Sequence, residues 1–207
     1  MAKIKTIKGR QVFDSRGNPT VEAEIYSDKG LMATAIVPSG ASTGGYEAFE
    51  LRDKDNKSYL GKSVLKAVEN INGPIRNVLK GIDYSNQKKL DKTLIDLDGT
   101  KQKKKLGANA ILAVSIASCK LAAIEKKIPL FKYLSNSKKN NIPIPLLNII
   151  NGGVHAKNNL DIQEFMIRPE NPKSFAEAMR MSFLVIQTLK ALIDNTNVGD
   201  EGGFAPN

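Results

Sequence analysis

The apolar segment at residues 108–126 constrains the fold most, because as a helix it would be apolar on nearly every side. Such a helix must be covered by other elements of the structure. Asn109 and Lys120 interrupt the segment, which is too short to span a bilayer comfortably, and Pro129 limits it at the far end. We therefore predict that it is the buried central helix of a domain.

Three short strands are predicted before this helix. Residues 5–13 lead into a turn-rich cluster at 14–19, and residues 20–26 alternate apolar with acidic side chains, the pattern of a half-buried strand. The Asp-Lys-Gly sequence at 28–30 is typical of a hairpin turn, and residues 31–37 form the third strand. The pattern predicts an antiparallel meander.

Two helical patterns separate this meander from the central helix. The first follows Ser63, is interrupted at Gly73-Pro74 and resumes to residue 79; the second follows Ser85 and ends at Asp98-Gly99. Serine is a favoured helix N-cap, so Ser63 and Ser85 are the predicted caps. Together these elements predict an α+β domain over residues 1–138.

The sequence pattern changes after a polar and basic stretch at residues 135–141, where we place a domain boundary. Residues 142–150 predict a strand with prolines at its entry, and residues 161–168 predict a second strand. Ser174 and Glu177 match a capping box that opens a helix to about residue 194, and Val198 starts another strand. Residues 139–207 therefore read as the start of an α/β domain.

The chain carries 31 basic and 21 acidic residues, a net charge of +10 that favours anionic partners such as a phosphorylated metabolite, nucleic acid or an acidic membrane surface. The lysines are dispersed with few aromatic residues between them, which indicates solvated surfaces rather than a nucleic-acid site. A single cysteine, Cys119, excludes an internal disulfide and is interpreted as a packing residue. With no visible signal peptide, we expect a cytoplasmic protein.

Polar residues beside glycine pairs are the candidates for chemistry. Glu201 precedes Gly202-Gly203 where a short strand runs out, a position that suits a catalytic acid or a metal ligand. His155, the only histidine, follows Gly152-Gly153 in a loop that exposes its imidazole. Because the chain has no second histidine, a histidine-rich zinc site is disfavoured. Considered without its neighbours, His155 is equally consistent with a structural and a functional role.

Glu164 lies within an apolar strand pattern. If it shares a face with Ile162 and Met166, its carboxylate points into an enclosed space and needs a partner, which Glu201 could supply. When one of two neighbouring carboxyl groups is ionised, its negative charge disfavours ionisation of the other. The second group can therefore keep its proton and act as a general acid. The alternative is that Glu164 faces the surface.

The run Gly40-Ala41-Ser42-Thr43-Gly44 matches the nucleophile elbow of serine hydrolases. That motif needs a helix directly after it, and residues 46–55 do not predict one. A loop that closes over an anion and lends a serine to a metal is favoured instead. A phosphate-binding P-loop and a dinucleotide-binding fingerprint are both absent from the sequence, which disfavours kinases and nicotinamide-dependent enzymes.

Taken in order along the chain, these runs closely resemble the enolase family. The matching segments are residues 14–20, 38–44, 107–112, 147–153, 163–167 and 199–207. The resemblance spans the whole chain but only about the first half of the family's length. It implies a three-stranded sheet with helices at residues 1–138, followed at residues 139–207 by the first elements of an eight-stranded α/β barrel of the TIM type.

The resemblance also implies a function, the Mg²⁺-dependent reversible dehydration of 2-phosphoglycerate to phosphoenolpyruvate in glycolysis. It assigns Ser42 to the second of two Mg²⁺ ions, and His155 and Gln163 to substrate binding. Glu164 and Glu201 become the acidic pair at the departing hydroxyl, with Glu201 as proton donor. Homodimers are implied for the complete enzyme, and family members are cytoplasmic, with some at the cell surface or secreted.

The carboxylates for the first Mg²⁺ and the lysine base of the family have no counterpart in these 207 residues. We therefore expect the chain alone to be inactive, and its open barrel segment to be disordered, aggregated or bound to a complementing chain. Tyr46 stands where members of the resembled family carry other residues, often basic residues or histidine. Two alternatives stay open: a non-catalytic basic fragment that binds RNA or a protein partner, and a serine hydrolase that uses Ser42.

Overall fold

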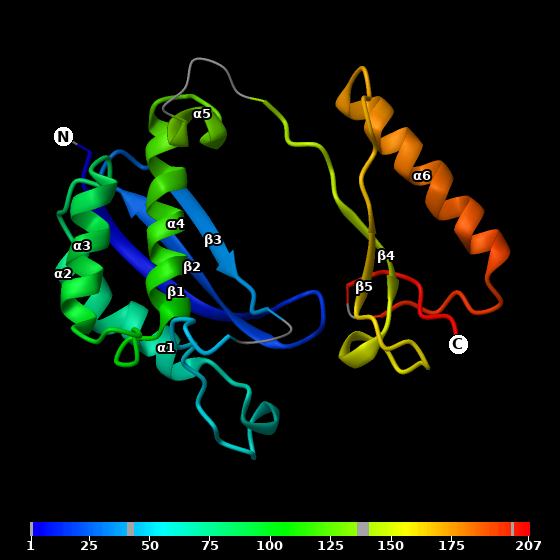
Figure 1. Cartoon of the computed structure of the whole chain (residues 1–207). Helices are drawn as coiled ribbons and strands as arrows, with labels where there is room; N and C mark the ends of the chain where they lie inside the picture. Colours follow the sequence, from blue (N-terminus) through cyan, green and yellow to red (C-terminus); the bar gives the residue numbers. More distant parts are fainter. Residues whose placement is uncertain (1, 41–43, 136–140, 200) are drawn as a thin grey trace. The chain divides into compact units, whose positions relative to one another are not determined.

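The computed structural model describes residues 2–40, 44–135, 141–199 and 201–207. The chain divides into two compact units, Met1–Lys138 and Lys139–Asn207, which we call the N-terminal unit and the C-terminal unit. The two units differ in architecture (Figure 1).

The N-terminal unit is built on the predicted antiparallel meander. Its strands are β1 (Ile4–Phe13), β2 (Pro19–Ser27) and β3 (Met32–Val37), hydrogen-bonded in the order β1-β2-β3. In the central strand Val21, Ala23 and Ile25 are fully buried, which is the alternation read from the sequence. The prediction of a three-stranded sheet is confirmed.

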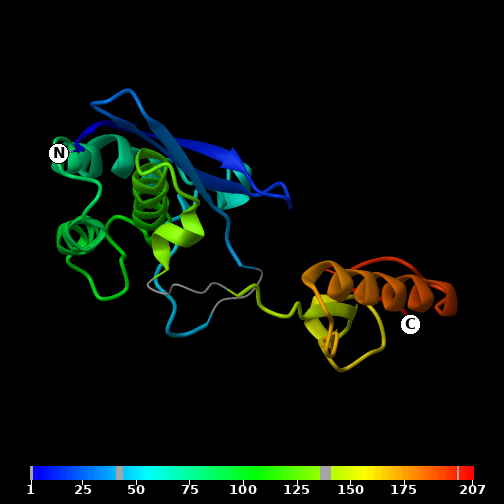
Figure 2. The same cartoon turned by 90° about the horizontal axis from the view of Figure 1, so that it is seen from above.

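Helix α4 (Ala108–Glu125) lies across this sheet, packed on β2 and β3 (Figures 1 and 2). Ten of its 18 residues are buried, among them Leu121 and Cys119. By length and composition alone α4 could cross a membrane, but its apolar surface is used in packing within the unit. The prediction of a buried central helix is therefore confirmed. Burial also raises the pKa of the Cys119 thiol, as expected for a packing residue.

The predicted break at Gly73-Pro74 is a widened turn rather than an interruption. Helix α1 (Leu65–Asn70) runs through a π-helical turn (Ile71–Ile75) into α2 (Arg76–Leu79). Pro74 has no backbone N–H to donate, and a wider turn accommodates it without ending the helix.

Both predicted serine caps were wrong. The first amides of α1, those of Leu65 and Lys66, donate to the carboxylate of Asp53, each at 2.9 Å. Ser63 instead donates to the side chain of Gln11. Helix α3 (Gln87–Asp98) is capped by Asn86, whose Oδ1 accepts from the Lys89 amide at 3.1 Å, one residue after the predicted Ser85.

Asp98 connects the end of α3 to the segment that enters α4. It is 2% exposed, and its carboxylate accepts hydrogen bonds from the amides of Thr100 at 2.9 Å and Leu106 at 2.7 Å. Burial alone would raise its pKa, but the bonds from Thr100 and Leu106 outweigh burial and hold the pKa below its ordinary value. Two short helical segments complete the unit, a 3-10 turn (Tyr59–Gly61) and α5 (Leu130–Leu134).

The C-terminal unit contains β4 (Leu147–Asn151), a 3-10 turn (Gly153–His155), β5 (Glu164–Ile167) and α6 (Phe175–Leu192). Strands β4 and β5 pair antiparallel. Both are shorter than predicted. The strand expected at residues 142–150 begins only at Leu147, because the prolines at 143 and 145 have no N–H for a ladder.

The strand predicted to start at Val198 does not form in the part of this unit that the structure describes. Val198 and Phe204 make one isolated antiparallel bridge, and Ile150 and Phe204 make one parallel bridge. The Phe204 carbonyl accepts from the Asn151 amide at 2.8 Å, so the end of the chain lies along β4. Among the described residues these elements begin a barrel region but do not close it.

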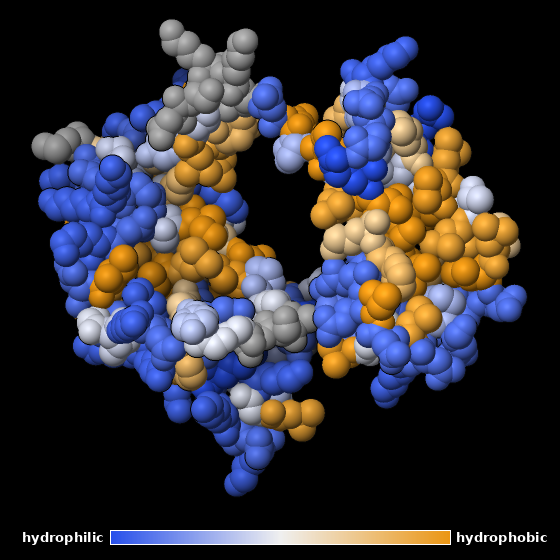
Figure 3. Space-filling model, viewed as in Figure 1, coloured by the Kyte–Doolittle hydropathy of each residue, from blue (hydrophilic) through white to orange (hydrophobic). Residues whose placement is uncertain are grey.

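Helix α6 begins as predicted, with Ser174 Oγ accepting from the Glu177 amide at 3.1 Å. The Glu177 carboxylate bonds back to the Lys173 amide at 2.7 Å, one residue before the cap. Apolar side chains gather over α6 in Figure 3. The exposed ones include Phe183, Leu184, Val185 and Leu192.

Candidate functional site

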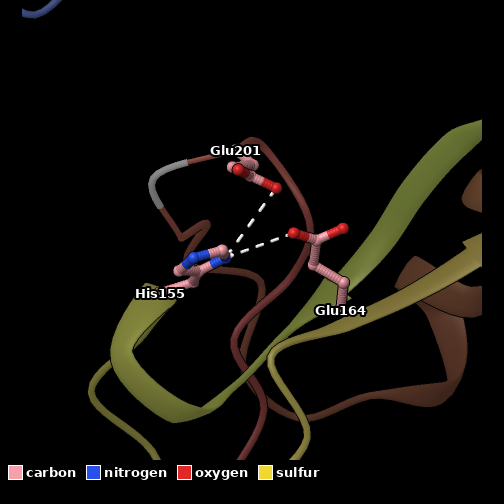
Figure 4. Close-up of side chains that lie close together, drawn as sticks. All are labelled: His155, Glu164 and Glu201. Atoms are coloured by element: carbon pink, nitrogen blue, oxygen red, sulfur yellow. Dashed lines mark ion pairs between the residues drawn. The ribbon is translucent and has the colours of Figure 1, made fainter. Parts of the chain in front are cut away.

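Three segments of the C-terminal unit bring His155, Glu164 and Glu201 together (Figure 4). His155 ends the 3-10 turn after β4, Glu164 begins β5, and Glu201 lies in the loop near the end of the chain. One possible ligand atom from each side chain lies within 4.8 Å of the other two. All three residues were predicted from the sequence.

Both carboxylates face the same ring nitrogen of His155 (Figure 4). Its Nδ1 is 3.5 Å from Glu164 Oε1 and 3.8 Å from Glu201 Oε2. The His155 side chain is 13% exposed, and its Nδ1 has no hydrogen-bond partner among the described residues. When the imidazole is protonated, it can attract both carboxylates and fix where each one points.

The connection between β4 and β5 places His155 beside Glu164. Asn151, the last residue of β4, pairs with Glu164, the first of β5. Between them the Gly152 amide donates to the Gln163 carbonyl at 3.0 Å, and the Gly153 amide donates to the Leu160 carbonyl at 2.6 Å. The loop therefore folds back on itself just where His155 leaves the strand.

Asn148 is a site residue that the sequence analysis missed. Its Nδ2 donates to Glu201 Oε2 at 3.4 Å, and its Oδ1 is buried without a partner in the described part of the chain. Strand β4 reads Leu-Asn-Ile-Ile-Asn, and an amide within an apolar strand must find hydrogen-bond partners. That pattern was the available signal for both Asn148 and Asn151.

The three-residue cluster offers one nitrogen and two carboxylate ligands to a cation. Mg²⁺ takes oxygen ligands in octahedral geometry, whereas an imidazole in the ligand set suits transition metals. The cluster therefore does not fit a Mg²⁺ site. Ser42, the predicted Mg²⁺ ligand, lies outside the described residues.

Gln163 stands next to the cluster in sequence, but its side chain is exposed, and its carbonyl is what binds the β4–β5 loop. Residues 41–43 of the possible hydrolase motif also lie outside the described residues. The segment that follows, residues 44–58, contains no helix. A nucleophile elbow requires a helix at this position, so the segment argues against a serine hydrolase.

Comparison with known families places both units. Residues 4–134 match the family described as "Enolase, N-terminal domain", and residues 139–207 match "Enolase, C-terminal TIM barrel domain". The chain belongs to the enolase family, whose members catalyse the phosphopyruvate hydratase reaction of glycolysis and use Mg²⁺.

Among curated proteins, the enolase of Pelagibacter ubique (strain HTCC1062) is 60% identical to this chain over 210 residues. The alignment covers all of this chain and 50% of the relative. The chain thus spans about half the length of the curated relative that it matches.

Proposed function

We propose that this chain supplies the acid side of an enolase active site, which converts 2-phosphoglycerate reversibly to phosphoenolpyruvate and water. The observation that carries the proposal is the convergence of His155, Glu164 and Glu201 from three separate segments. In the dehydration direction a carboxylic acid must give a proton to the departing hydroxyl, which leaves as water. With two carboxyl groups beside one imidazole, one of them can carry that proton and donate it to the departing hydroxyl.

Glu201 is the proposed proton donor, with Glu164 completing the acidic pair. His155 and Gln163 are proposed to contact the substrate. A protonated imidazole donates to a phosphate or a carboxylate, and 2-phosphoglycerate carries both groups. The net charge of +10 favours such an anionic substrate.

The reaction also needs a base and bound Mg²⁺, which stabilises the negative charge of the enolate when present. We propose that Ser42 serves the second of the two Mg²⁺ ions. The other ligands and the lysine base are proposed to lie in the half of the enzyme that this chain does not match. Complete enolase is proposed to act in the cytoplasm as a homodimer, and this chain alone is proposed to be inactive.

The test is complementation. The chain is mixed or co-expressed with a second chain that carries the uncovered half of the Pelagibacter ubique relative, and phosphoenolpyruvate formation is followed by its ultraviolet absorbance. The mixture should show Mg²⁺-dependent activity, whereas either chain alone should not. Glu201→Gln should lower the rate about 10²–10⁴-fold, the usual contribution of general acid catalysis.

Glu170→Gln is the matched control. Glu170 is 62% exposed and pairs with Arg168 rather than with the cluster, so its replacement should leave the rate unchanged. Full activity of the Glu201→Gln mixture would refute the role of Glu201. Turnover by the chain alone would refute the need for the second half.

A further inference from the structure

Asn151 lies at the point where the three site segments meet. It is fully buried, and its backbone amide donates to the Phe204 carbonyl at 2.8 Å. Each end of its side-chain amide also bonds to a different segment. A buried amide with both ends engaged holds its neighbours in one arrangement, because any shift leaves a polar group unpaired.

The oxygen end of the side chain holds the segment that carries Glu201. Asn151 Oδ1 accepts from the Gly203 amide at 2.9 Å. The Gly199 amide in turn donates to the Gly203 carbonyl at 2.8 Å, which closes the turn between these two glycines. Glu201 lies within that turn, so the hydrogen bond from Gly203 to Asn151 holds the backbone that carries Glu201.

Gly199 and Gly203, which close this turn, both pack directly on Asn151. A Cβ atom at Gly199 would lie 2.7 Å from Asn151 Cβ, and one at Gly203 would lie 2.7 Å from Asn151 Oδ1. These distances are too short for any side chain. The turn is therefore seated on the Asn151 side chain from two sides.

The nitrogen end of the side chain holds the segment that carries Glu164. Asn151 Nδ2 donates to the Gln163 carbonyl at 3.4 Å, one residue before Glu164. On the third segment, Asn158 Nδ2 donates to the Asn151 carbonyl at 2.8 Å and fastens the loop that follows His155. One residue thus contacts the supports of all three cluster members.

We propose that Asn151 is a positioning residue, which sets the distances of Glu201 and Glu164 from the His155 imidazole through the two ends of its amide. Asn151 is not in contact with the reacting groups itself. The proposal rests on the proposed function only for its effect on catalysis. The geometry can be tested without any turnover.

The chain has a single histidine, so the nitrogen and carbon resonances of one imidazole report on the cluster. We would measure how these resonances, in the complete 207-residue chain, respond to Glu201→Gln and to Glu164→Gln. In the chain with its native Asn151, each glutamate substitution should shift the imidazole resonances. In Asn151→Ala both responses should be lost, because both ends of the amide are gone.

Asn151→Asp separates the two ends. Aspartate keeps an acceptor for the Gly203 amide but has no donor for the Gln163 carbonyl. The response to Glu201→Gln should therefore persist, while the response to Glu164→Gln should fall. This variant also decides the matter if Asn151→Ala unfolds the C-terminal unit, which the amide resonances of α6 would reveal.

Asn109→Ala is the matched control. Asn109 is a 4% exposed amide that bridges the N–H and the carbonyl of Leu51 within the N-terminal unit, at 3.1 and 3.0 Å. Its removal should leave both imidazole responses intact. Two results would overturn the proposal. In the first, neither glutamate substitution shifts the imidazole resonances of the unaltered chain. In the second, both substitutions still shift them in Asn151→Asp.

The same variants in the complementation assay would distinguish the two proposals. Asn151→Ala should lower kcat more than it raises KM, because the acid is misplaced while substrate contacts remain. The unaltered chain could show the expected imidazole shifts and yet give no activity when mixed with the second half. That result would refute the proposed function and leave the positioning role of Asn151 intact. Activity that is unaffected by Asn151→Ala would refute the positioning and leave the function intact.

Discussion

The two units of this chain divide stability and chemistry between them. The core cluster of buried apolar residues, from Ala2 to Ala122, lies wholly in the N-terminal unit. In the described part of the C-terminal unit the buried apolar side chains are Pro169, Ala178, Phe204 and Ala205, while α6 leaves several large side chains exposed. The cluster of His155 with two glutamates belongs to this second unit.

The difference shows two ways of holding a structure. In the N-terminal unit the sheet and α4 bury apolar side chains, and removal of that surface from water is the main stabilising term. In the C-terminal unit, hydrogen bonds around Asn151 hold short segments whose apolar surfaces are unpaired. The acidic cluster is therefore supported by polar contacts rather than by a filled core.

Substitution of matched leucines should give the largest contrast between the units. Leu121 in α4 is fully buried, and Leu192 in α6 is 77% exposed. Leu121→Ala should lower the free energy of unfolding by about 2–5 kcal/mol, since it leaves a cavity. Leu192→Ala should change it by less than about 0.5 kcal/mol, as is usual at the surface. Urea unfolding followed by circular dichroism measures both, and equal losses would break the comparison.

Acid should weaken the N-terminal unit through Asp98. Because its pKa is lowered in the folded state from an ordinary value of 3.8, the carboxylate stabilises the fold above that value. The contribution is lost as the pH falls through the lowered pKa. Asp98→Asn should cost about 1.5–3 kcal/mol near neutral pH, the range for hydrogen bonds to a charged group. The variant should also lose less stability than the parent chain between about pH 4 and pH 2. Parallel acid-induced losses in the two proteins would count against this role.

The smallest expected effect is local to α6. Ser174→Ala removes the oxygen that accepts from the Glu177 amide and should destabilise this helix by about 0.5–2 kcal/mol. Hydrogen exchange should quicken for the first turn of α6, while the protection of α4 stays the same. A loss of protection in both helices would show that the two units unfold together.

Much of the fold followed from periodicity, whereas the errors came from contacts that periodicity does not encode. The strands of the meander and the buried α4 were read from local apolar spacing. The cap of α1 comes from Asp53, 12 residues before Leu65, and no local pattern marks that pairing. At α3 both Ser85 and Asn86 are good caps by type, so the choice between them depended on the chain path.

The site shows the same limit. His155, Glu164 and Glu201 could be selected because charged groups beside glycines or within an apolar strand are unusual. Asn148 and Asn151 were missed, because their partners depend on the register of β4 with β5. That register shifts between Asn148 and Ile150, and a shift of this kind cannot be read from alternation.

The burial of Cys119 has a chemical consequence. Its thiol is 7% exposed and burial raises its pKa, so it is shielded and largely protonated near neutral pH. An alkylating reagent can reach this sulfur mainly in the molecules where α4 has lifted from its neighbours. Because it is the only cysteine, its rate of modification serves as a built-in clock for the opening of the N-terminal unit.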